Sequence, residues 1–115
     1  MQRMMLKSKI HRATLTATDL QYEGSIAIDK TLLEAADILP GEQVHVLNLN
    51  NGNRLITYAI EADAHSGTVM LNGPAARCGL PGDIVVIITY AAMDDACAKN
   101  RKADIVHVDS KNRIK

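Results

Sequence analysis

One internal repeat limits the possible folds of this chain more than any other feature. Residues 35–42 (AADILPGE) precede the strand-like segment 44–46 (VHV), and residues 75–83 (AARCGLPGD) precede the apolar segment 84–86 (IVV). Each copy reads as a helix end, a Leu-Pro-Gly turn closed by an acidic residue, and a strand. Two copies in 115 residues predict a pseudo-twofold β-barrel and not a longer repeat array. Closure into a barrel would also remove exposed strand edges.

The rest of the chain reads mainly as short strands. Alternation within Met4–Thr16 predicts a strand that has Lys9 and His11 on one face and Leu6 and Ile10 on the other. The turn-forming run NNGN separates two further strands as in a hairpin. Additional strands are predicted at 25–28, 43–49, 54–61, 67–72, 83–90 and 105–108, with short helices at 30–38 (capped by Asp29), 74–77 and 94–99.

The composition excludes several classes of protein. Lys plus Arg equals Asp plus Glu at 13 each, which argues against a nucleic-acid binder, and the longest apolar runs are far too short to cross a bilayer. The first nine residues lack the apolar segment of a signal peptide, and two separated cysteines read as free thiols in a reducing cytoplasm. The chain has no Trp or Phe, so we expect an aliphatic core and burial of further surface by oligomerisation. The polar tail 109–115 is expected to fray.

Gly24-Ser25 is a candidate for chemistry on the backbone itself. A serine hydroxyl can attack the preceding carbonyl and convert the peptide into an ester, and glycine at that position permits strained geometry. β-Elimination from the ester leaves dehydroalanine, which hydrolyses to a pyruvoyl group. Because Gly-Ser pairs are also common in ordinary loops, the pair alone does not predict this reaction.

Polar residues on the strand at 54–61 form a second candidate group. Arg54 and Tyr58 share one face, and Thr57 lies on the other. A guanidinium binds carboxylates through paired hydrogen bonds, and a phenol is protonated at pH 7 and can donate a proton. The alternative is a strand with a surface arginine and a half-buried tyrosine.

The segment Asn72-Gly73-Pro74-Ala75 reads as a strand end that turns into a helix, whose N-terminus could receive an anion. The alternative is a simple connection between a strand and a helix, with no binding function. His45, His65 and His107 are scattered without metal-ligand spacing, and we assign them no function.

Taken together, several separated segments resemble the pyruvoyl-dependent aspartate 1-decarboxylases. The similarity runs from about Met4 to Asp95 and keeps the order and spacing of every motif. The matching segments are 5–14 (MLKSKIHRAT), 22–26 (YEGSI), 51–58 (NGNRLITY), 72–73 (NG) and 81–83 (PGD). Pro74 departs from the family, which usually has Ala there, and a proline offers no backbone N–H to a substrate.

The resemblance implies a mainly β fold, a double-psi β-barrel with short helices. It implies one domain, 1–115, that cuts itself between Gly24 and Ser25 into a short chain, 1–24, and a longer chain, 25–115. Ser25 would become the pyruvoyl group that forms a Schiff base with the substrate, so neither a metal nor pyridoxal phosphate is expected. The proton donor would be Tyr58. The substrate-binding residues would be Lys9, His11, Arg54, Thr57, Asn72, Gly73, Pro74 and Ala75.

The implied reaction converts L-aspartate to β-alanine and CO2 for the synthesis of pantothenate and coenzyme A. Family members are cytoplasmic homotetramers with sites between protomers, and no nucleic acid or membrane partner is expected. The sequence leaves open whether a helper protein assists the cleavage.

Two other interpretations remain at this stage. A non-catalytic β-barrel binding module would leave Ser25 unprocessed and the chain uncut. A strand-swapped DNA-binding dimer is favoured by the basic N-terminus and opposed by the zero net charge, and it would show salt-dependent DNA affinity.

Overall fold

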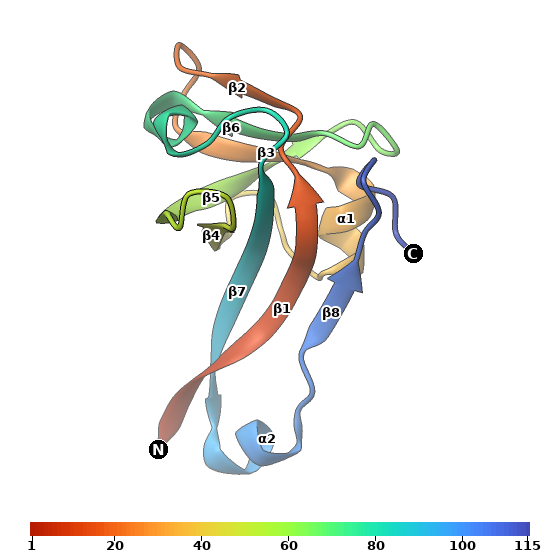
Figure 1. The fold of residues 1–115 in the computed structure, drawn as a ribbon. Helices are drawn as coiled ribbons and strands as arrows, with labels where there is room; N and C mark the ends of the chain where they lie inside the picture. Colours follow the sequence, from red (N-terminus) through yellow and green to blue (C-terminus); the bar gives the residue numbers. More distant parts are fainter.

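A computed structural model describes residues 1–115, and its main element is a sheet of eight strands that curls around an aliphatic core (Figure 1). The helices are short, and none is long and apolar enough to span a membrane. The strands are β1 (Gln2–Thr14), β2 (Ala17–Asp19), β3 (Ser25–Asp29), β4 (Gln43–Asn48), β5 (Arg54–Ala62), β6 (Val69–Asn72), β7 (Ile84–Asp94) and β8 (Asp104–His107). The helices are α1 (Lys30–Ala35), the 3-10 helix η1 (Gly73–Cys78) and α2 (Asp95–Asn100).

The sheet order explains the curvature. The strands lie in the order β2-β6-β3-β5-β4-β7-β1-β8, so β1 and β2 lie near opposite ends of the sheet although only Leu15 and Thr16 separate them in the chain. The Thr16 N–H donates to the Val69 carbonyl at 2.8 Å, which ties this connection to β6. The structure confirms the mainly β prediction and agrees with a barrel, while the double-psi connectivity stays a prediction.

The two Leu-Pro-Gly turns form the same hydrogen bonds. The Leu39 N–H donates to the Glu42 carboxylate at 3.1 Å, and the Leu80 N–H donates to the Asp83 carboxylate at 3.0 Å. The glycine before each acid has a positive φ, +89° in the first turn and +94° in the second, which a residue with a side chain rarely adopts. The repeated sequence therefore forms a repeated local structure.

The strand pairing has the pseudo-twofold relation that the repeat predicts. The two copies are 41 residues apart (83 minus 42). In the antiparallel pair β4–β7, Val46 lies opposite Ile87, and in the antiparallel pair β3–β6, Ile28 lies opposite Val69. Both pairs join residues that are 41 positions apart, so an axis relating the two copies passes through both pairs.

A β-bulge changes which face the start of β1 presents. Leu6 lies opposite Tyr90 while Ser8 lies opposite Thr89, so one extra residue interrupts the register between them. Thr89 and Tyr90 are neighbours on β7 and so point to opposite faces of the sheet, and their partners Ser8 and Leu6 therefore point to opposite faces as well. Leu6 therefore shares the face of Lys9, and the prediction that places these two on opposite faces was wrong.

The C-terminal tail is attached to the barrel, so the prediction that it frays was also wrong. Val108 and Ile114 form an isolated bridge. The Asn112 side chain, only 2% exposed, donates to the carbonyls of Thr14 and Gly67, both at 2.8 Å, and accepts from the Thr14 N–H at 2.7 Å. Because buried polar groups need hydrogen-bond partners, these bonds hold the polar tail to the barrel.

Helix α1 begins where predicted and ends three residues early. The Asp29 carboxylate caps it by accepting from the Thr31 N–H at 2.8 Å, and Asp37, with φ of +54°, cannot continue the helix to residue 38. The same carboxylate accepts from the N–H groups of His65 and Gly67 at 3.0 and 2.8 Å. Burial raises the pKa of Asp29, but these hydrogen bonds outweigh it and hold the pKa below its ordinary value.

We expect Asp29→Asn to lower the free energy of unfolding by about 1–3 kcal/mol at pH 7, because an amide has only one acceptor oxygen for three N–H donors. The pKa of Asp29 is lower in the folded protein than the unfolded value of about 3.9, so the ionised carboxylate stabilises the fold at any pH above that value. This stabilisation is lost as the pH falls through the pKa of the folded protein. Urea unfolding at pH 7 and pH 3 measures the difference in the free energy of unfolding between wild type and Asp29→Asn, and this difference should be smaller at pH 3. The exposed Asp63→Asn is the control, and equal effects of the two substitutions at pH 7 would contradict the prediction.

Candidate active site

Ser25 is enclosed at the start of β3, where two other segments hold its hydroxyl group. Its side chain is 1% exposed, and its Oγ donates to the Glu23 carbonyl at 3.3 Å. Asn72, the last residue of β6, lies opposite Ser25 and donates to the same Oγ through Nδ2 at 3.1 Å. The hydroxyl is thus oriented and removed from bulk water.

The segment before Ser25 lies against the start of η1. Gly73 has φ of +62°, and a Cβ built on it would lie 2.8 Å from Gly24 Cα and N and from the Tyr22 carbonyl oxygen. Only glycine allows this close approach. A Cβ built on Gly24 would lie 3.3 Å from Pro74 Cδ, and Ala75, the next residue of η1, is buried. Gly24, the residue before Ser25, is therefore closely packed against the Gly73–Pro74 segment.

Tyr58 is placed beside Ser25 by the strand register. In the parallel pair β3–β5, Ile26 lies opposite Ala59, and extending this register by one residue puts Ser25 next to Tyr58 on the same face. Tyr58 is 39% exposed, so its phenol can meet a molecule from solvent. Thr57 lies on the other face of β5, as predicted, and is half-buried. Asn72, Ser25 and Tyr58 thus form a row across β6, β3 and β5.

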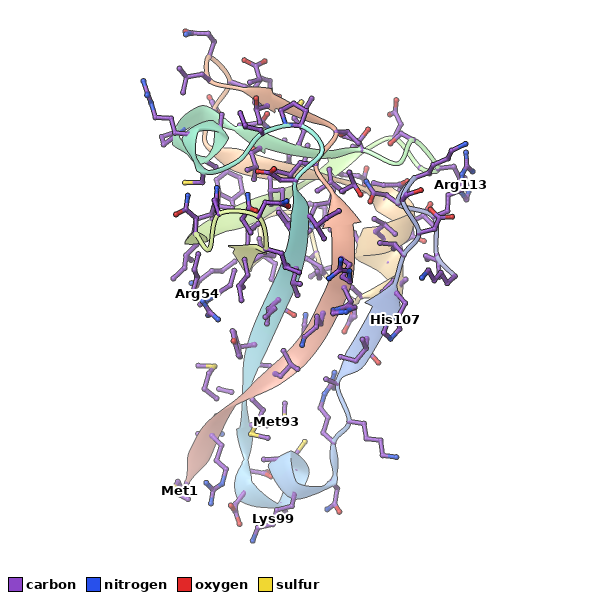
Figure 2. The ribbon with its side chains drawn as sticks, in the orientation of Figure 1. Met1, Arg54, Met93, Lys99, His107 and Arg113 are labelled. Atoms are coloured by element: carbon purple, nitrogen blue, oxygen red, sulfur yellow. The ribbon has the colours of Figure 1, made fainter.

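Arg54 lies on the Tyr58 face as the first residue of β5. The two are four positions apart along the strand, roughly 13 Å at about 3.3 Å per residue. The exposed Arg54 guanidinium donates through Nη1 to His45 Nδ1 at 3.5 Å. In Figure 2 it lies at the outside of the barrel.

Lys9 and His11 are not brought to Ser25 within one protomer. Both are on β1, which β4 and β7 separate from β5. His11 lies opposite His107 on β8, with ring centroids 5.5 Å apart, and Figure 2 shows His107 far from Arg54. Burial lowers the pKa of His11, and the cationic groups of His107, Lys9 and Arg12 lower it further. The predicted site residues therefore form two separate groups in one chain.

Two features of the site have no clear signal in the sequence. Asn72 Oδ1 is buried and has no hydrogen-bond partner, although its Nδ2 is used. His45, to which we assigned no function from sequence, contacts Arg54 and packs against Tyr90. The β4–β5 register alone brings His45 close to Arg54. No three His, Cys, Asp or Glu residues are grouped as metal ligands would be.

Comparisons with known proteins all point to one family. The family model described as aspartate decarboxylase matches residues 1–115. A protein of Thermoanaerobacter pseudethanolicus named aspartate 1-decarboxylase is 58% identical over 113 residues, which cover 98% of this chain and 97% of the relative. A protein of Dehalococcoides mccartyi with the same name is 56% identical over 110 residues, 96% of this chain and 89% of the relative.

Proposed function

The chain belongs to the aspartate decarboxylase family, and from this premise we propose that it converts L-aspartate to β-alanine and CO2 with a pyruvoyl group made from its own Ser25. The observation that carries the proposal is the enclosed Ser25 hydroxyl, held by Asn72 beside the closely packed Gly24. We further propose that the β-alanine supplies pantothenate synthesis in the cytoplasm. The alternative of a non-catalytic module gains no support from relatives that are named as enzymes over nearly their whole length.

The proposed processing cuts the chain into residues 1–24 and 25–115. Ser25 Oγ attacks the Gly24 carbonyl carbon, the peptide C–N bond breaks, and the Ser25 nitrogen becomes a free amine. Loss of the Ser25 α-proton then expels the Gly24 carboxylate and leaves dehydroalanine. Water replaces the nitrogen, releasing ammonia and leaving the ketone of the pyruvoyl group. Asn72 supports the first step because its Nδ2 orients the hydroxyl.

The surroundings of Ser25 fit such a group. Asn72 Oδ1 is buried without a donor, and an unsatisfied buried acceptor costs about 1–3 kcal/mol. The ammonium or amine of aspartate would supply that donor. When present, a pyruvoyl ketone condenses with the substrate amine and draws electrons from the carboxylate that leaves. Tyr58, on the same row, is placed to donate the proton that replaces that carboxylate.

We propose that neighbouring copies complete the site. Arg54, Lys9 and His11 would bind substrate carboxylates, yet one protomer holds them apart from Ser25. The outer face near Tyr58 also exposes Ile56 by 58%, an apolar side chain that a second copy could cover. Sedimentation equilibrium should give a homotetramer, and a monomer with full activity would contradict this.

The proposed activity is tested by incubating the purified protein with L-aspartate. Proton NMR should show the two coupled methylene signals of β-alanine growing as aspartate is consumed, with CO2 released in equal amount. L-Glutamate, one methylene longer, should react far more slowly because the retained carboxylate would miss its anchor. Fully cut protein that makes no β-alanine would contradict the proposal.

A further inference from the structure

We propose that His45 is a positioning residue that holds the Arg54 guanidinium ready for a substrate carboxylate. The inference rests on the proposed function of Arg54 as the carboxylate anchor and extends it to a residue outside the predicted site. It begins from the 3.5 Å contact between Arg54 Nη1 and His45 Nδ1.

The chemistry of the two groups fixes the state of the imidazole. A guanidinium has five N–H donors and no acceptor, so Nδ1 of His45 must be the acceptor in this contact. The proton of the neutral ring is then on Nε2. A protonated His45 would instead place two cations side by side, and the contact would be lost.

The structure also restrains the His45 ring itself. Its centroid lies 5.1 Å from that of Tyr90 in an edge-on arrangement, a favourable geometry for two rings. The His45 side chain also lines a cavity of about 360 Å³ on the outer face, together with Met4, Gln43 and Tyr90. None of these side chains is a carboxylate, so the cavity lining supplies no negative charge beside the contact between His45 and Arg54.

An anchored guanidinium should bind substrate better than a free one. Arg54 is exposed, and an arginine without a partner loses more rotamer freedom when it captures a carboxylate. His45 makes no hydrogen bond or ring pair with Ser25 or Tyr58, so its loss should raise KM and leave kcat nearly unchanged. Loss of a residue that only supported the fold would not raise KM while leaving kcat unchanged.

Arginine side-chain NMR tests the contact without any turnover. We compare wild type with His45→Leu, which has no acceptor, and His45→Asn, whose Oδ1 replaces Nδ1. The ¹⁵N–¹H NOE of Arg54 Nε should fall in His45→Leu and recover in His45→Asn. The same NOE in all three proteins would overturn the proposal.

Steady-state kinetics on fully cut protein provide the second measurement. We expect His45→Leu to raise KM for L-aspartate about 3–10-fold, the effect of one modest hydrogen bond, with His45→Asn within about twofold of wild type. His65→Asn, the same substitution in a distant loop, is the control. A kcat loss in His45→Leu without a change in KM would also overturn the proposal. If wild type does not turn over aspartate, the proposed function fails, and the NMR result alone decides the role of His45.

Discussion

Ser25→Ala protein should remain one uncut chain and make no β-alanine. Without the hydroxyl there is no nucleophile at the Gly24 carbonyl, so neither the ester nor the ketone can form. Intact mass under denaturing conditions should give one 115-residue species for the variant. Wild type should give pieces of 24 and 91 residues (115 minus 24), the longer one blocked to Edman sequencing.

The repeat provides a matched control for this experiment. Ser66 lies 41 residues after Ser25, the same spacing that separates the two copies, and it is exposed in a loop. Its Oγ accepts from the Thr68 N–H and has no buried partner. Ser66→Ala should be cut and active like wild type. A cut at a bond other than Gly24–Ser25, or activity from uncut Ser25→Ala, would refute the processing proposal.

Local signals were sufficient to predict most of the fold. Alternation marks the strands, Asp29 marks the start of α1, and the repeated Leu-Pro-Gly turns predict the pseudo-twofold pairing. The wrong prediction for the tail arises from contacts between distant parts of the chain. Asn112 fixes the tail through Thr14 and Gly67, partners 98 and 45 residues away, which no local pattern reveals. The three-residue strand β2 is also too short to show alternation.

The candidate site was predictable in residue type but not in arrangement. Matching motifs select Ser25 and Asn72, but only the β3–β6 register shows that Nδ2 reaches Oγ. Alternation predicts that Lys9 and His11 face away from Ile10, yet it cannot give the order of strands in the sheet. That order separates β1 from β5 within the protomer. His45 was missed for the same reason, because its contact with Arg54 depends on pairing between β4 and β5.

Tyr58→Phe should lower kcat by roughly 10²-fold or more while leaving the fold and the cleavage largely intact. The substitution keeps the ring and removes only the hydroxyl of Tyr58, a residue that the register of β3 and β5 puts next to Ser25. Because Tyr58 is 39% exposed, losing its hydroxyl leaves no buried polar group unpaired and should cost little stability.

The mass of the Tyr58→Phe protein must be checked first, because uncut protein would imitate a catalytic defect. Proton NMR in D2O then follows the rate, and proton NMR of the β-alanine after its amine is coupled to a chiral acid shows on which side of the carbon the deuterium lies. Wild type should place one deuterium on the carbon that lost its carboxylate, on one side only. If the phenol is the proton donor, the slow reaction of the variant should deliver deuterium from solvent to both sides. Fully cut Tyr58→Phe with the kcat and the one-sided labelling of wild type would remove Tyr58 from this role, and the proton would then have to come from another group near Ser25.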